Sequence, residues 1–264
     1  MVGVVSLAVL GMTATLAGAQ TDEAFGIPTA GLPKEKPRLY RYESYWAVPP
    51  AHWGDVDKDN ATSNEKVLAP ALADGTIVGY GDEENLVHPE ESFTHDNWWQ
   101  AKSPLPVDVM KLVEAFHKSG GSSSLVNATQ HWTQLYVSVF YNWKAGSWKG
   151  AYGVRYVYKL RPGVDPEDAV HLLSGSYVPT LEKLLADGTI VKYEIDKESG
   201  RGIDSPGQII LTYVAPSADG LKKWYAVLGA ALNEDSVITP LKASIFLNAE
   251  TPRIDYVRVN ATYN

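Results

Sequence analysis

The sequence has 264 residues, a formal charge of −8 and no cysteine, so disulfides, thiolate metal sites and cysteine nucleophiles are excluded. The negative charge, without any Lys/Arg cluster, argues against a nucleic-acid partner, because phosphate binding requires a basic surface. The length allows two units of about 100 residues each, a common domain size.

The N-terminus has the pattern of a secretory signal. Residues 2–17 are apolar or small and uncharged, and Ala17-Gly18-Ala19 fits a small-x-small cleavage site, although no Lys or Arg precedes the apolar run. We therefore predict a signal peptide over residues 1–19 and export to the periplasm or extracellular space, with no membrane span after its removal. Residues 20–38 are rich in proline and glycine and are expected to form a linker or arm.

Two successive units follow, over residues 39–145 and 146–264. Each is expected to run strand, helix, strand, strand, helix, strand. The predicted elements are 40–48, 63–73, 76–80, 93–100, 103–116 and 132–143, then 152–160, 165–185, 189–195, 209–214, 217–232 and 254–261.

Several local signals define these elements. Ser63 and Ser103 are expected to cap helices, and Pro70 is expected to bend the first helix or move its start. Asp165 followed by proline is a strong helix start. Residues 51–62 and the acidic residues 82–84 are expected to form loops, and a turn at 143–148 joins the units.

One heptapeptide occurs in both units. Residues 72–78 and residues 185–191 both read LADGTIV, with a helical pattern before the glycine and β-branched residues after it. Tyr45 and Tyr80 recur at the same offset as Tyr158 and Tyr193. These matches predict a tandem duplication, and so paired domains.

Two junction types carry a family resemblance: the helix-to-strand junctions at 72–80 and 185–191, and the strand-to-helix passage at 98–103. With them, residues 40–262 resemble the dimeric α+β barrel superfamily of small monooxygenases, EthD-like proteins and haem-processing relatives. The resemblance implies an α+β fold in which two tandem ferredoxin-like βαββαβ units pack sheet-to-sheet as an intramolecular, pseudo-dimeric α+β barrel. It also implies a cavity between the sheet and the helices of each unit.

The predicted ligand-binding residues lie on one strand and one loop. His95, Asn97 and Trp99 share one face of an alternating strand and could orient a ligand there, whereas the alternative is a strand edge in solvent. His52 and Trp53 follow a strand end, where binding groups are common, whereas the alternative is a turn that packs Trp53 onto the core. No catalytic residue is assigned.

No metal site and no cofactor are predicted. The six histidines include no H-E-x-x-H motif and no pair at helical spacing. Some haem-using relatives place an iron ligand on a helix, so the resemblance leaves His117 or His171 as a possible haem ligand.

Three functions fit these patterns. The first is an exported protein that binds a small apolar or aromatic molecule in a cavity of the barrel, because the chain is rich in Trp and Tyr. The second is an oxygenase-like or isomerase-like enzyme of the dimeric α+β barrel type. The third is a non-catalytic structural or partner-binding protein that uses Trp143 and Trp148. Ligand identity, enzyme activity and oligomeric state stay open.

Overall fold

The computed structural model describes residues 36–87, 92–102, 111–112, 114–115, 118, 127–199, 207–234, 238–249 and 251–264, with no side chains described at 228–240. The predicted signal peptide and most of the predicted arm lie outside these residues. So does most of the helix predicted after Ser103.

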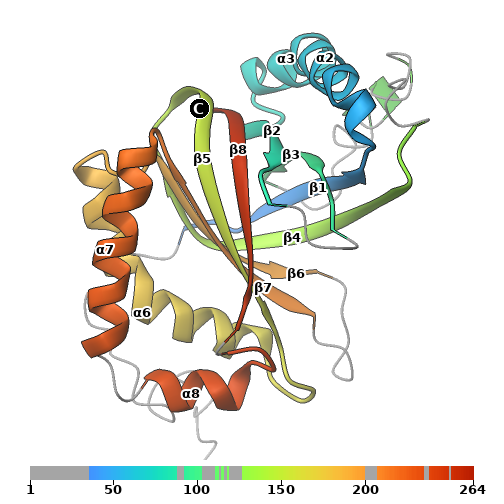
Figure 1. Ribbon diagram of the computed structural model, residues 1–264. Helices are drawn as coiled ribbons and strands as arrows, with labels where there is room; N and C mark the ends of the chain where they lie inside the picture. The colour runs from blue at the N-terminus through green and yellow to red at the C-terminus, as the bar shows by residue number, and fades with distance from the viewer. Residues whose placement is uncertain are drawn as a thin grey trace, which may run out of the picture.

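The described strands form one closed antiparallel barrel in the order β1-β3-β2-β8-β5-β7-β6-β4 (Figure 1). The first four strands are adjacent as β4-β1-β3-β2 and the last four as β8-β5-β7-β6, and β2–β8 and β4–β6 pairs join the two sets. Their bounds are β1 Leu39–Ala47, β2 Gly79–Asn85, β3 His95–Ala101, β4 Gln130–Trp143, β5 Gly146–Lys159, β6 Lys192–Glu198, β7 Gln208–Ala215 and β8 Arg253–Tyr263. The fold is therefore α+β, with an eight-stranded barrel at its centre.

The helices lie outside the barrel in two groups on opposite sides (Figure 1). One group is η1 Pro50–His52, α2 Trp53–Ser63, η2 Asn64–Leu68 and α3 Ala69–Ala73; the other is α6 Pro166–Ala186, α7 Ala218–Glu234 and α8 Ile238–Ile245. The predicted start of α6 is confirmed, because the Asp165 carboxylate accepts a hydrogen bond from the Glu167 N–H at 2.9 Å and Pro166 is the first helical residue. Among the described residues, no helix has both the length and the apolar character needed to cross a lipid bilayer.

Two predicted loops are wrong. Residues 53–63 form α2, so Trp53 begins a helix, and Ser63 lies at the end of α2 instead of capping a later helix. Residues 82–84 belong to β2, which pairs with both β3 and β8. The acidic side chains do not prevent strand formation there because they alternate between the barrel interior and the outer face.

The two heptapeptide copies have the same local structure. In each copy the aspartate side chain accepts a hydrogen bond from the threonine N–H, at 2.9 Å for Asp74 and Thr76 and at 2.8 Å for Asp187 and Thr189. The glycines that follow the helices have φ angles of 81° and 82°, a conformation that favours glycine. In each case a strand begins directly after the heptapeptide, β2 at Gly79 and β6 at Lys192.

Tyr45 and Tyr158, which match in sequence, do not occupy equivalent positions in the structure. Tyr45 packs inside the barrel against Phe93 and Trp132, whereas Tyr158 packs on the outside against Phe246 beneath the helices. A one-residue offset in a strand moves a side chain to the opposite face, so the identity of the two tyrosines does not preserve their role.

Gly81 of β2 is required by close packing. A Cβ atom at this position would lie 2.6 Å from the Asn260 carbonyl oxygen and 2.8 Å from Trp98 Cζ2. We expect Gly81→Ala to lower the free energy of unfolding by about 2–3 kcal/mol, as overpacking does. Gly54→Ala in α2 is the control, since a Cβ there meets nothing within 4 Å and is expected to add up to about 0.5 kcal/mol. Urea unfolding of both variants checks this pair; equal stabilities would contradict it.

Candidate functional site

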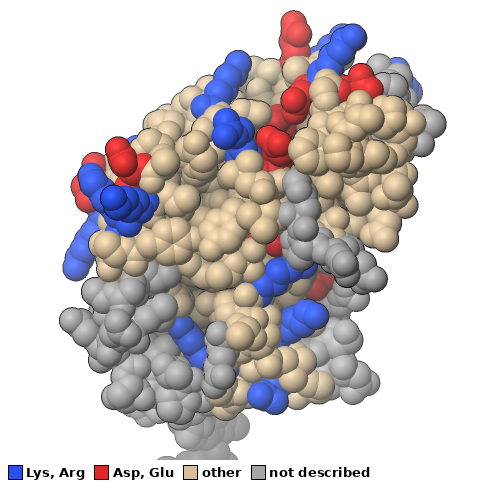
Figure 2. All heavy atoms as spheres, viewed as in Figure 1, with Lys and Arg blue, Asp and Glu red and all other residues tan. Residues whose placement is uncertain are grey.

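A cavity of about 600 Å³ lies between the α2–η2 helix and the outer face of β2 and β8, with the first residues of β5 on its far side. Its size suits a small ligand. Polar side chains dominate the lining, and this face of the molecule carries acidic and basic groups side by side (Figure 2).

The carboxyl group of Asp82 is buried in the cavity wall. Its Oδ2 accepts a hydrogen bond from Asn64 Nδ2 at 2.8 Å, and its Oδ1 accepts one from Asn260 Nδ2 at 2.9 Å. Burial raises the pKa of Asp82 above its usual value, and the two amide hydrogen bonds oppose that shift. The wall therefore holds a fixed carboxyl group that accepts a proton more readily than one in water.

Asn64 lies at the start of a widened helical turn. In η2 the Ala69 N–H donates to the Asn64 carbonyl five residues earlier, as in a π-helix. Pro70 follows directly, and in a regular α-helix its ring would clash with the Lys66 carbonyl, so we attribute the widened turn to this proline. The sequence predicts that Pro70 bends the helix or moves its start; in the structure the helix is instead widened just before Pro70. Such turns are frequent at functional sites.

A β-bulge shapes the opposite wall. The register of β5 against β8 shifts between Trp148 and Ala151, and Gly150 within the bulge has a φ of 65°. The Gly150 N–H donates to Asn260 Oδ1 at 3.0 Å, so Asn260 connects the bulge to Asp82. Bulges redirect side chains, and here Lys149 lines the cavity.

Three of the predicted ligand-binding residues lie together under α2. His95 is buried and lines the cavity, its Nδ1 is 2.9 Å from Thr94 Oγ1, and its ring centroid is 5.7 Å from that of Trp53. Asn97 donates from Nδ2 to Asn60 Oδ1 at 3.4 Å, and Asn60 is a cavity residue. The outer face of β3 thus meets the cavity at its His95 end.

The other two predicted residues lie apart from this group. Trp99 stacks on Tyr42 with 5.6 Å between ring centroids and belongs to the core beneath η2 and α3. The side chain of His52 is 37% exposed, and its Nδ1 is 3.3 Å from Asp55 Oδ2. Trp53, which contacts His95, is also held by a hydrogen bond from its Nε1 to the Val48 carbonyl at 2.9 Å.

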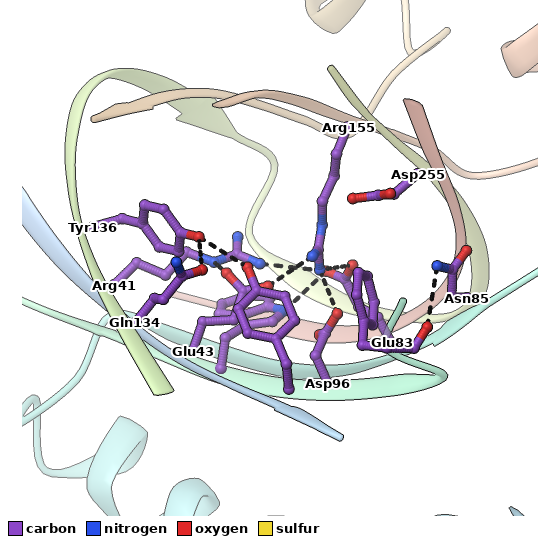
Figure 3. A network of polar contacts seen from close by, with 12 residues as sticks. Arg41, Glu43, Glu83, Asn85, Asp96, Gln134, Tyr136, Arg155 and Asp255 are labelled. Atoms are coloured by element: carbon purple, nitrogen blue, oxygen red, sulfur yellow. Dashed lines mark hydrogen bonds and ion pairs between the residues drawn. The ribbon is translucent and has the colours of Figure 1, made fainter. Parts of the chain in front are cut away.

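A second polar cluster fills the barrel interior, where Arg155 extends between Glu43, Glu83 and Asp96 (Figure 3). Arg155 Nη1 is 2.8 Å from Glu43 Oε1, and Nη2 is 2.7 Å from Asp96 Oδ2 and also pairs with Glu83. Each of these side chains is at most 3% exposed. The cluster is sealed from solvent and connects strands of both halves of the barrel.

Arg41 and Lys192 continue this interior cluster. Arg41 Nε is 2.7 Å from Glu43 Oε2 and its Nη1 is 3.1 Å from Glu194 Oε2, while Lys192 Nζ is 2.6 Å from the same Glu194 oxygen. Both cations lie over the ring of Trp98, at 4.4 and 4.5 Å from its centroid. Burial raises the pKa of Asp96 well above its usual value, despite the opposing effect of Arg155. Asp96 therefore accepts a proton more readily than an exposed carboxyl group does.

The comparisons with known proteins concern the fold alone. Neither the family models nor the curated proteins include a match to this sequence. Solved structures do share its architecture. A candidate monooxygenase from Lactobacillus acidophilus has a TM-score of 0.57 at 9% identity, over 86% of this chain and 97% of that one. A candidate monooxygenase from Fusobacterium nucleatum has a TM-score of 0.53 at 9% identity, and an anthrone oxidase-like protein has 0.52 at 12%, each over 86% of this chain and 94% of the other.

The protein shares the α+β barrel fold of these structures. The barrel architecture that the resemblance implied is thus confirmed. The cavity lies between helices and sheet, but it differs from the expected cavity within each unit, because β5 and β8 of the second predicted unit also line it.

The structure describes only one of the two histidines considered for haem. His117 lies outside the described residues. His171 of α6 packs edge-on against Phe140, with 6.1 Å between ring centroids, as part of the contact between helix and sheet. This packing does not fit an axial ligand, and we derive no step through haem. Among the described residues, no group of three or more His, Asp or Glu side chains could hold a metal ion.

Sequence reasoning missed both polar clusters. Charged residues do alternate along the strands that carry the interior cluster, as in Arg41 with Glu43 and Lys192 with Glu194. That alternation normally indicates a solvent-facing side, and only closure of the barrel turns it inward. The contact between Asp82 and Asn260 joins positions far apart in the chain, and no local signal predicts it.

Proposed function

We propose that the protein binds a small polar molecule in the cavity between α2–η2 and β2–β8. One observation carries this proposal: Asp82, Asn64, Asn260 and the bulge at Gly150 form a hydrogen-bonded chain along the cavity wall. Polar groups fixed in this way provide orientation to a ligand. We propose a polar ligand in place of the predicted apolar or aromatic one, because most of the lining residues have polar side chains.

Filling the cavity tests the proposal. Ala61 of α2 lines the cavity and is exposed, so Ala61→Phe is expected to occupy part of the space without disturbing the core. We expect it to weaken ligand binding at least tenfold, which is about 1.4 kcal/mol. Native mass spectrometry of the purified protein, followed by calorimetry with any bound molecule, measures this.

Ala73→Phe is the matched control, because Ala73 is also exposed and helical but lies away from the cavity. Binding should be unchanged in this variant. Equal affinity in Ala61→Phe and the unmodified protein would refute binding at this cavity.

A second candidate function is an oxygenase-like or isomerase-like enzyme. The raised pKa of Asp82, on the wall of a ligand-sized cavity, favours it, because a proton acceptor works best with a pKa near the working pH. Asp82→Asn keeps the shape and is expected to abolish turnover, by about 100-fold or more, while ligand affinity changes less. Turnover that survives this substitution would exclude Asp82 as the proton acceptor.

We also propose that the chain arose by tandem duplication and that the protein is exported. The equal strand order of the two halves and the equal hydrogen bonds of the two heptapeptides support a tandem duplication of one ferredoxin-like unit. Export as a secreted or periplasmic protein rests on the apolar N-terminal segment alone. N-terminal sequencing of the protein from its native host would test the cleavage after Ala19.

A further inference from the structure

The cavity lining carries both acidic and basic side chains, which come from different elements. Asp57 and Glu65 from the α2–η2 helix and Glu84 from β2 contribute carboxylates, whereas Lys149 from β5 and Arg258 from β8 contribute cations. The carboxylates come from the helix and β2, and the cations from the β5–β8 side. Figure 2 shows acidic and basic side chains meeting on this face.

Glu84 and Arg258 are cross-strand neighbours, and their charged groups are available to a ligand in the cavity. They are directly opposite on β2 and β8 and both line the cavity. Opposite charges at such positions usually pair. Within the residues that the structure describes, however, the two make no ion pair with each other, and Arg258 lies over the Tyr152 ring instead, at 5.6 Å.

Two backbone irregularities, the β5 bulge and the π-turn of η2, also place charged residues at the cavity. The bulge that places Lys149 on the cavity disrupts the β5–β8 ladder, and the π-turn beside Glu65 disrupts the helix. Irregular backbone costs stability and is retained mainly where it positions functional groups. Lys149 lies within one irregularity and Glu65 within the other, so each places a charged residue on the cavity lining.

We propose that the cavity selects a zwitterion, a molecule with an ammonium group at one end and a carboxylate at the other. The ammonium group is held by the carboxylates of the helix and β2, and the carboxylate by Arg258 and Lys149. A guanidinium offers a carboxylate two parallel hydrogen bonds, so Arg258 supplies the geometric specificity. This inference rests on the proposed function and specifies its ligand class.

Calorimetry with simple probes tests the charge requirement. The probes are ε-aminocaproate and γ-aminobutyrate, each compared with the amine and the carboxylate of the same chain length. We expect at least one zwitterion to bind about tenfold or more tightly than both single-charge analogues. Arg258→Gln should reduce that zwitterion to the affinity of the amine and leave the amine itself unchanged.

Lys222→Gln is the control for net charge, because Lys222 is exposed on α7 far from the cavity lining. It should leave every affinity unchanged. Amine binding as tight as zwitterion binding, or zwitterion binding that Arg258→Gln does not change, would overturn the inference. If both zwitterions fail while another molecule binds and Ala61→Phe abolishes its binding, the zwitterion inference fails and the proposed function stands.

Discussion

Arg155→Met is expected to lower the free energy of unfolding by about 3–5 kcal/mol, because Arg41 alone cannot balance the buried carboxyl groups that Arg155 contacts. Arg155 contacts Glu43, Glu83 and Asp96, and all of these groups are inaccessible to solvent. Methionine keeps much of the volume, so the loss comes mainly from the uncompensated charge. Chemical unfolding at neutral pH measures it.

Two further variants identify the cause of that loss. Arg38→Met removes a half-exposed cation that pairs with Glu167 on the surface, and is expected to cost at most about 1 kcal/mol. Adding Glu83→Gln to Arg155→Met removes one orphaned charge and should restore part of the stability. If the double variant is as unstable as the sum of the two single variants, charge is not the cause.

Much of the architecture was accessible from the sequence because it depends on local chemistry. The repeated heptapeptide encodes a helix end and a glycine with positive φ directly before a strand, and the structure forms this junction twice. The loop predicted before the first helix failed because α2 is short of apolar residues: Val56 is its one buried apolar side chain. Its helical structure therefore depends on the cavity wall and the strands it covers.

The candidate site was only partly accessible for a different reason. Alternation correctly placed His95 and Asn97 on one face of β3, and that face meets the cavity. The partners of that face come from α2, β8 and a bulge in β5, which only the closed barrel brings together. The sequence likewise does not predict the charged barrel interior, because the alternation of a strand is the same for an enclosed polar face and a solvated one.

Glu194 should have the second largest effect, and its effect depends on pH. Nearby Lys192 and Arg41 outweigh the effect of burial and lower the pKa of Glu194 to about 2. A carboxyl group with a lowered pKa adds stability above its unfolded pKa of about 4.3, and that stability is lost as the pH falls through about 2. We expect Glu194→Gln to cost about 3–5 kcal/mol at neutral pH, because the buried Lys192 loses the carboxylate that it pairs with and Arg41 loses one of its three.

Asp196→Asn is the matched comparison on the same face of β6, since burial and the charge of Glu194 raise the pKa of Asp196 well above its usual value. A raised pKa means that the protonated form favours folding, so Asp196 contributes stability at low pH that is lost as the pH rises. The neutral amide should therefore leave stability at neutral pH unchanged or higher. Urea unfolding across the pH range measures both variants. Glu194→Gln should flatten the curve between about pH 4.3 and pH 2, and Asp196→Asn should flatten it above about pH 4. Equal losses at neutral pH would contradict the opposite pKa shifts of these two carboxyl groups.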